Sequence, residues 1–113
     1  MLIVDDHEAF RQSARDLLEA EGFEVVATVP DGPAAITASI ELDPELVVLD
    51  IHLPGIDGFT VAVELAALPH PPVVVLTSSR AASSFGALID AAPVRGFLAK
   101  HELSGEALAS FLA

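Results

Sequence analysis

The sequence predicts an α/β protein, a three-layer doubly wound fold in which one sheet of five parallel strands carries helices on both faces. Short apolar runs alternate with helical patterns along the 113 residues, and no internal repeat interrupts this order. Three of the runs are apolar almost throughout, as expected for strands covered on both faces of a parallel sheet: residues 1–4, 46–49 and 73–76. Right-handed crossovers would connect the five β-α units.

The first half of the chain is expected to hold three strands and two helices. After the strand at 1–4, apolar residues spaced at i, i+4, i+7 and i+8 predict a helix, and these residues are Phe10, Ala14, Leu17 and Leu18. Gly22 suits the end of this helix, because glycine adopts a left-handed conformation at little cost. The second strand is expected at 24–29 and the third at 45–49, with a helix between them that starts at Pro33.

The second half begins with a loop rich in turn residues, 50–58, in which Asp57 is expected to be a turn or cap residue. The remaining elements are helices at 59–67, 82–91 and 104–112 and strands at 73–76 and 95–99. Ser104 is a suitable N-cap for the last helix. The helix at 82–91 has the weakest sequence pattern, because it opens with serines and contains Gly86.

Polar side chains stand where four of the predicted strands end, and they are Asp5, Asp6, Asp50, Thr77 and Lys100. The carboxyl ends of parallel strands meet at one edge of the sheet, so these side chains are expected to lie together. Three clustered carboxylates repel one another unless a cation joins them, and an oxygen-liganded ion such as Mg²⁺ would do so. The hydroxyl and the ammonium are groups that hold phosphoryl oxygens. The pattern therefore predicts a phosphoryl-transfer site built around an aspartate.

Composition excludes several classes of protein. Hydrophobic residues make up 52% of the chain, too many for a disordered segment. The net charge of −12 argues against direct nucleic-acid binding, which needs Lys and Arg to neutralise phosphates. The apolar runs are far shorter than the roughly 20 residues of a membrane span, and Asp5 interrupts the first run too early for a signal peptide. Because cysteine is absent, no disulfide framework is expected. From these observations together we expect a cytoplasmic protein that does not bind membranes.

Taken together, these residues resemble a known family. Over essentially all of residues 1–113, the chain is similar to the receiver domain of bacterial two-component response regulators. The similarity rests on four segments in the family's order and spacing: Val4-Asp5-Asp6-His7, Asp50 to Gly58, Leu76-Thr77-Ser78 and Phe97-Leu98-Ala99-Lys100. It implies one flavodoxin-like domain with strand order 2-1-3-4-5, in which the first and third strands are neighbours. It also implies a signalling module, not an enzyme that acts on a separate substrate.

The resemblance implies a role for each residue of the acidic cluster. Asp50 would accept a phosphoryl group from a sensor histidine kinase or a phosphotransfer protein. Asp6 and Asp50 would ligate Mg²⁺ directly, Asp5 would act through water, and the backbone carbonyl of His52 would supply a further ligand. Mg²⁺ is therefore the expected cofactor.

The family resemblance also assigns the residues that would bind and report the phosphoryl group. Thr77 and Lys100 would bind the oxygens of the acyl phosphate, and Thr77 and Phe97 would form a switch. His52 and Ser79 occupy two variable positions that help to set the lifetime of the phosphate. The expected output is an attached DNA-binding domain or a phosphorylation-dependent homodimer.

Other interpretations stay open. Asp5 and Asp6 could cap the first helix, and Phe97 could be an ordinary core residue. A Mg²⁺-dependent aspartyl phosphohydrolase would use Asp50 as its nucleophile, but such enzymes commonly carry a second acid two residues later, where this chain has His52. A receiver-like scaffold that binds partners without being phosphorylated would not require all of the polar groups.

Overall fold

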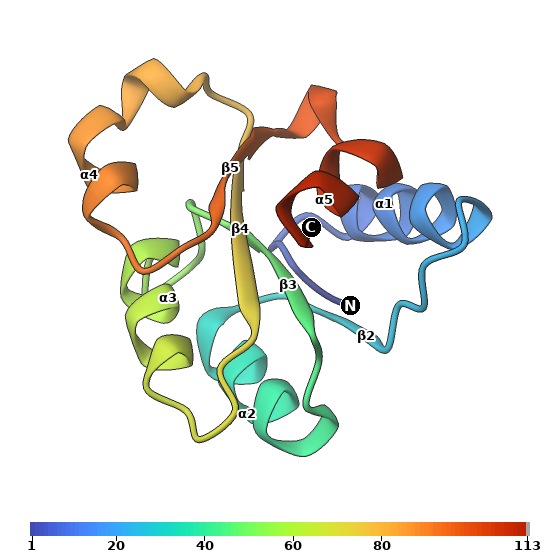
Figure 1. Ribbon diagram of the computed structural model, residues 1–113, viewed down its shortest axis with the longest axis horizontal. Coiled ribbons are helices and arrows are strands. Elements are labelled where there is room, and N and C mark those ends of the chain that lie inside the picture. The colour runs from blue at the N-terminus through green and yellow to red at the C-terminus, as the bar shows by residue number, and fades with distance from the viewer. Residues whose placement is uncertain (113) are drawn as a thin grey trace.

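The computed structural model describes residues 1–112 and contains one parallel sheet with the strand order β2-β1-β3-β4-β5 (Figure 1). The strands are β1 (Leu2–Val4), β2 (Ala27–Val29), β3 (Leu46–Asp50), β4 (Val73–Ser78) and β5 (Gly96–Ala99). Every pair of neighbouring strands is parallel, so each connection must cross over the sheet. The predicted fold class and strand order are confirmed.

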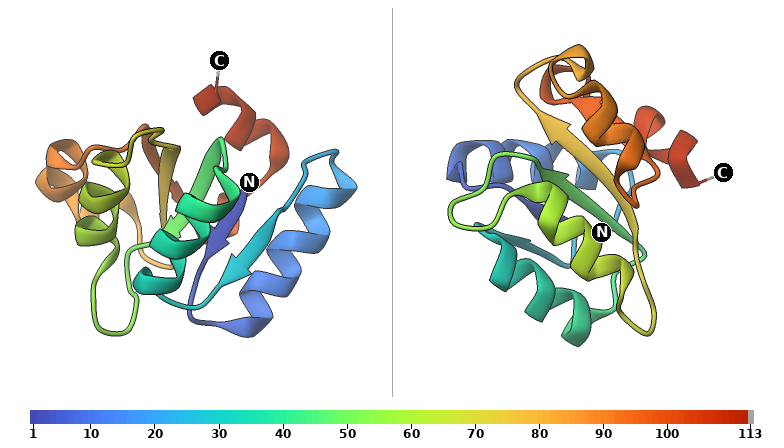
Figure 2. Two further views of the ribbon diagram at one scale, coloured as in Figure 1. Left: turned by 90° about the horizontal axis from the view of Figure 1, so that it is seen from below. Right: turned by 90° about the vertical axis from the view of Figure 1, so that its left-hand side faces the viewer.

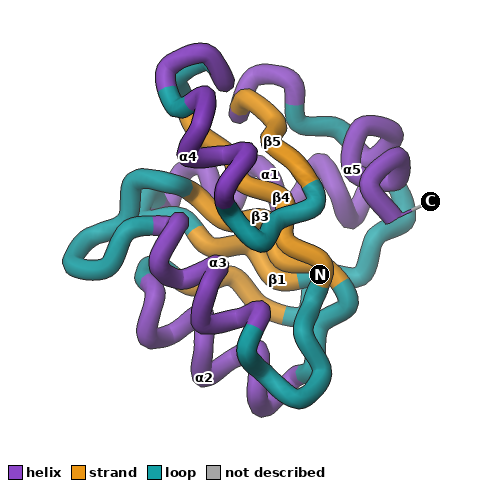
Figure 3. Tube along the Cα trace, turned by 60° about the vertical axis from the view of Figure 1, so that its left-hand side comes forward, coloured by secondary structure: helices purple, strands orange, loops and turns teal. Residues whose placement is uncertain are grey.

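Helices cover both faces of this sheet, and Figure 3 shows the strands between the helical layers. One face is covered by α2 (Gly32–Leu42) and α3 (Gly58–Ala66), the other by α1 (Glu8–Ala20) and α5 (Gly105–Leu112), as Figures 1 and 2 show from three directions. A short helix, α4 (Gly86–Ala91), and two 3₁₀ turns, η1 (Ala82–Ser84) and η2 (Lys100–Glu102), complete the elements. None of the helices in residues 1–112 is long and apolar enough to cross a membrane.

Alternate residues of the strands face the two layers. Leu2 and Val4 of β1 pack with α2 and α3, whereas Ile3 between them packs with α1 and α5. β3 repeats this pattern, with Val48 facing α1 and α5. In β1 and β3 both faces of the strand are buried in apolar surroundings, which explains why residues 2–4 and 46–49 are apolar without interruption.

β2 is shorter than predicted and β4 is longer, whereas β3 has the predicted length but lies one residue further along the chain. The predicted second strand starts at residue 24, but pairing with β1 begins only at Ala27, which lies opposite Leu2. The carbonyl of Glu24 is bound instead by the N-terminal ammonium of the chain, at 2.8 Å. β3 and β4 take in Asp50 and Thr77, which the sequence pattern places just beyond the strands.

The helix predicted at 82–91 is interrupted. Its first residues form the 3₁₀ turn η1, and α4 begins only at Gly86, whose φ of +29° lies outside the right-handed helical range. The caps predicted elsewhere are confirmed: Asp57 and Ser104 each accept a hydrogen bond from the backbone N–H three residues later, at 2.9 and 3.1 Å.

Gly58, the first residue of α3, lies tightly against the end of β3. A Cβ at this position would clash with the carbonyl oxygen of Asp50 and lie 2.8 Å from Cα of Ile51. The Gly58 N–H also donates to the Ile51 carbonyl at 2.8 Å. Glycine is therefore required where the loop 51–57 returns to the strand that carries Asp50.

The substitution Gly58→Ala is expected to lower the free energy of unfolding by about 3 kcal/mol, the upper end of the usual cost of overpacking. The reason is that both contact atoms are backbone atoms, one in the last residue of β3 and one in the residue after it, and they cannot move without shifting the end of the strand. Urea unfolding measures the change. Gly22→Asn is the matched control, because Gly22 has a φ of +94°, no described atom lies within 4 Å of a Cβ there, and asparagine tolerates a positive φ. Equal losses in the two variants would contradict the close-packing explanation.

Candidate functional site

Three adjacent strands bring three buried polar side chains to the carboxyl edge of the sheet. Asp50 in β3 is the register partner of Thr77 in β4, and Asp5 directly follows β1. Each of these three residues exposes no more than 1% of its surface. Asp6, the next residue, is exposed. The structure therefore brings together the carboxylates and the hydroxyl that the sequence places at strand ends.

Lys100 reaches the same edge from the first residue of η2, directly after β5. Its Nζ lies 2.6 Å from Oδ2 of Asp5 and 3.4 Å from Oδ2 of Asp50. The ammonium also lies 4.7 Å from the ring centroid of Phe10 in α1, which is a cation–π contact. One cation therefore joins two buried carboxylates that come from neighbouring strands.

Burial and neighbouring charges shift the pKa values of both Asp50 and Lys100. Burial raises the pKa of Asp50 and the negative charge of Asp5 raises it further, while Lys100 and the His52 N–H, which donates to Asp50 Oδ1 at 3.2 Å, offset only part of the rise. Burial by itself would lower the pKa of Lys100, but hydrogen bonding to Asp5 and the charge of Asp50 outweigh it, so this pKa is raised. The site thus keeps Lys100 charged and disfavours the negative charge on Asp50.

Four residues at this edge offer ligand atoms that all lie within 4.8 Å of one another: Asp5, Asp6, His7 and Asp50. Carboxylate oxygens are the hard donors that Mg²⁺ takes in proteins. A single ammonium does not balance three carboxylates, so the set has room for a further positive charge. The donor chemistry of these residues therefore fits Mg²⁺.

His7 lies directly against the acidic cluster. Its Nδ1 lies 3.1 Å from Oδ1 of Asp5 and 3.0 Å from Oδ1 of Asp6, and its backbone N–H donates to Asp5 Oδ1 at 2.8 Å. The position of the histidine directly after the acidic pair predicts that it lies near the cluster. The contact of one ring nitrogen with both carboxylates is the detail that the sequence does not give.

The hydroxyl of Thr77 is buried and has no hydrogen-bond partner within residues 1–112. An unpaired buried polar group costs about 1–3 kcal/mol, and folded proteins rarely retain one without a reason. The backbone of Thr77 is fixed beside Asp50, because the Ile51 N–H donates to the Thr77 carbonyl at 2.9 Å. The hydroxyl is thus held next to Asp50 with its hydrogen-bonding capacity unused.

The remaining predicted residues lie around this edge. His52 and Ser79 are exposed and Phe97 is half-buried. The ring centroid of His52 lies 5.5 Å from that of Phe85, and Phe85 lies 6.3 Å from Phe97. No sequence pattern singles out Phe85, because this residue stands among serines, alanines and a glycine in a segment with a weak helical pattern.

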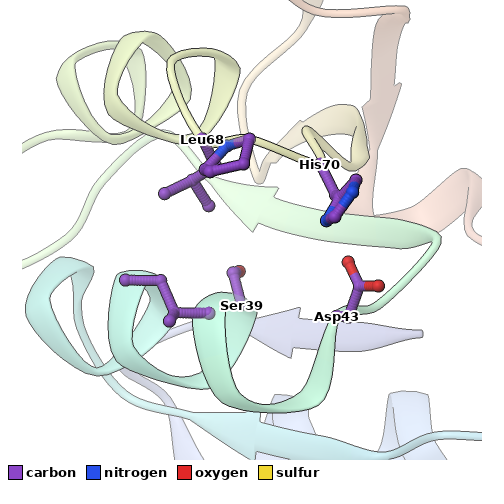
Figure 4. Close-up of a pocket in the computed structure, with 6 residues that line it drawn as sticks. Ser39, Asp43, Leu68 and His70 are labelled. Carbon is purple, nitrogen blue, oxygen red and sulfur yellow. The ribbon is translucent and has the colours of Figure 1, made fainter.

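A separate cavity of about 200 Å³ lies at the opposite edge of the sheet, beside the loops that lead into β3 and β4 (Figure 4). Figure 4 shows Asp43 and His70 facing each other across it, and Ser39 and Leu68 also line it. None of the polar residues at the strand ends contributes to this cavity. It is therefore distinct from the acidic site.

Comparison with known proteins identifies the family. Residues 1–111 match the family model of the response regulator receiver domain. The virulence-factor transcription regulator BvgA of Bordetella pertussis is 37% identical over 102 residues, which cover 90% of this chain and 49% of BvgA. The signal receiver domain of the response regulator NarL from Mycobacterium tuberculosis has a TM-score of 0.87 and 27% identity, with 99% of this chain and 94% of that chain covered. A DNA-binding response regulator of the LuxR family from Staphylococcus aureus has a TM-score of 0.83 and 26% identity, with 98% and 93% covered.

The chain therefore belongs to the response regulator receiver domain family, the signal-receiving modules of two-component systems. Its fold is the flavodoxin-like fold of the solved receiver domains. Receiver domains generally bind Mg²⁺ at an acidic pocket, and this chain has a cluster of aspartates at the carboxyl edge of its sheet. The chain spans about half the length of BvgA.

The substitution Asp50→Asn is expected to raise the free energy of unfolding at neutral pH in metal-free buffer. The folded pKa of Asp50 is raised above its unfolded value, so the carboxyl group favours folding below its ordinary pKa and loses this contribution as the pH rises through the folded pKa. At neutral pH the ionised group therefore opposes folding, and the advantage of the amide should shrink as the pH falls toward about 4.

Urea unfolding over this pH range measures the effect. Asp57→Asn is the matched control, because Asp57 is an exposed cap residue and asparagine caps helices equally well. A loss of stability in Asp50→Asn at neutral pH would show that the attraction of Lys100 outweighs burial and the repulsion of Asp5.

Proposed function

We propose that Asp50 accepts a phosphoryl group from the phosphohistidine of a sensor histidine kinase or a phosphotransfer protein, and that the chain is a signalling module controlled by this modification. One observation carries the proposal. The buried carboxylate of Asp50 has the Lys100 ammonium 3.4 Å away and, on the next strand, the unpaired hydroxyl of Thr77. A cation and a hydroxyl beside the carboxylate supply the positive charge and the hydrogen-bond donor that stabilise phosphoryl oxygens during transfer.

The transfer would form a bond between an Asp50 carboxylate oxygen and phosphorus while the bond between phosphorus and the histidine nitrogen of the donor breaks. The bonding electron pair returns to the imidazole of the donor. The Lys100 ammonium offsets negative charge on the phosphoryl oxygens, and the Thr77 hydroxyl donates a hydrogen bond to one of them. Transfer also ends the isolation of the Thr77 hydroxyl, because an acyl phosphate supplies the acceptor that it lacks.

Asp5, Asp6 and Asp50, together with the backbone carbonyl of His52, are the groups that would hold Mg²⁺. The ion supplies positive charge against the phosphoryl oxygens when it is bound. Asp5 also binds Lys100, so it keeps the ammonium next to the carboxylate that is modified. Burial and the charge of Asp5 raise the pKa of Asp50 and so disfavour its ionised form, whereas Lys100 lowers this pKa and a bound cation would lower it further, which favours the ionised, nucleophilic carboxylate.

The signal is proposed to leave the site through Thr77 and Phe97. The two residues lie on neighbouring strands, β4 and β5, and a Thr77 side chain drawn toward the phosphoryl group leaves space that the Phe97 ring can enter. Because BvgA is a transcription regulator and the LuxR-family relative binds DNA, we infer an attached DNA-binding domain as the output. Association of two phosphorylated copies is the alternative output. The absence of cysteine suits the reducing cytoplasm, where we place the protein.

Incubation of the wild type with acetyl phosphate and Mg²⁺ is expected to add one phosphoryl group, visible by intact-mass analysis. Asp50→Asn should gain none, whereas Asp57→Asn, which changes an exposed aspartate in the same loop, should be modified like the wild type. Thr77→Ala should still be modified, because the nucleophile is intact. An adduct on Asp50→Asn would show that the acceptor is another residue. A folded wild type that gains no phosphoryl group would favour the unphosphorylated scaffold.

Mg²⁺ at roughly 100 times its Kd is expected to raise the free energy of unfolding by about 2.7 kcal/mol, since the ion binds only the assembled carboxylates of the folded state. Unfolding with Mg²⁺ and after addition of EDTA measures the response. Asp6→Ala should lose most of this response to Mg²⁺. Asp16→Ala should keep the response, because Asp16 is an exposed α1 residue that accepts a hydrogen bond from Gln12. An unchanged response in Asp6→Ala would remove the metal site as drawn.

A further inference from the structure

The segment from residue 81 to residue 91, which contains η1 and α4, is held to the domain by few side chains. Within it only Phe85 and Ile89 are half-buried, and the other residues are exposed. α4 contains no buried residue at all. Figure 1 shows α4 at the upper left margin of the fold, on the same side of the sheet as α3. Phe85, which stands between η1 and α4, is therefore one of two anchors of this segment.

Phe85 contacts aromatic rings from three other parts of the chain. The centroid of its ring lies 5.5 Å from that of His52, 6.2 Å from that of Phe59 in α3 and 6.3 Å from that of Phe97 in β5. All three pairs are tilted, with interplanar angles of 44° to 57°, and tilted pairs at these distances attract one another. The anchor of the α4 segment is thus packed directly against a residue of the loop that follows Asp50.

His52 connects this packing to the acidic site. Its backbone N–H donates to Asp50 Oδ1 at 3.2 Å, so the backbone of His52 is tied to the carboxylate. Its side chain is exposed, and the Phe85 ring is a neighbour that can restrict where the imidazole lies. Restriction matters here, because an exposed side chain otherwise moves among its rotamers on a fast timescale.

We propose that Phe85 is a positioning residue that holds the His52 imidazole beside Asp50 and thereby makes the lifetime of the acyl phosphate depend on whether α4 is docked. The inference rests on the proposed phosphorylation of Asp50. In hydrolysis, a water oxygen forms a bond to phosphorus, the bond between phosphorus and the Asp50 oxygen breaks, and the water proton leaves with inorganic phosphate. A docked Phe85 keeps the imidazole in one place relative to the approaching water, whereas an undocked Phe85 releases it.

The contact itself is tested without phosphorylation. The ring proton resonances of His52, assigned with His52→Gln, should shift in Phe85→Leu, because leucine keeps the apolar contacts but has no ring current. Phe85→Tyr should restore the wild-type positions. Leu88→Ala is the matched control, since Leu88 lies on the same helix and is 59% exposed. Unshifted His52 resonances in Phe85→Leu would overturn the proposal.

The role in the reaction is tested with a double-mutant cycle on the rate of loss of the acyl phosphate. His52→Ala and Phe85→Leu should each change the half-life in the same direction, by roughly twofold to tenfold. This range is the energy of an aromatic contact expressed as a change in rate. In the double variant, the half-life of the acyl phosphate should change no more than it does in the single variant with the larger effect. Phe85→Tyr and Leu88→Ala should keep the wild-type half-life.

The outcomes separate the two levels of inference. Effects of His52→Ala and Phe85→Leu that multiply in the double variant, in a protein that is phosphorylated, would overturn the positioning role of Phe85 and leave the proposed function intact. A folded wild type that forms no acyl phosphate at all would overturn the proposed function and the lifetime role with it.

Discussion

The ammonium of Lys100 lies between two carboxylates that water barely reaches, and the architecture of the acidic edge depends on this contact. Asp5 directly follows β1 and Asp50 ends β3, while Lys100 comes from the far side of β4, directly after β5. Two buried carboxylates side by side are strongly unfavourable unless a cation accompanies them. The ammonium therefore ties the ends of three strands together, and Phe10 supports it from α1. Because the same ammonium compensates both carboxylates only in part, the site retains the affinity for positive charge on which Mg²⁺ binding and phosphoryl transfer would depend.

Much of this arrangement can be predicted from the sequence, because the order of residues along a parallel strand determines which of them are buried and which lie at its end. An apolar run with no polar break must be buried on both faces, and consecutive strands that run parallel must all end at the same edge. Once these two rules apply, Asp5, Asp50 and Lys100 can be assigned to one locality without knowledge of any contact. The strand order could not be predicted from periodicity. It was predicted from the resemblance to a family.

What could not be predicted depends on distances between side chains and on competition for backbone partners. β2 is short because its pairing begins opposite Leu2, a matter of register that residues 24–29 do not encode. The helix at 82–91 divides because Gly86 takes a positive φ in its context. Phe85 is a further example. Its contact with His52 arises from two loops that meet in space, and a phenylalanine at this position does not signal that contact by itself.

The sparse attachment of the α4 segment has a consequence for how such a domain can diversify. Residues in the core are constrained by several neighbours at once, whereas most residues from 81 to 91 touch little of the domain and can be exchanged at small thermodynamic cost. Substitutions on the exposed surface of α4 can therefore create a binding site for a new partner, while the anchor side chains and the acidic edge are unchanged. Receiver domains built in this way separate the part that carries out the chemistry from the part that is free to acquire new interactions.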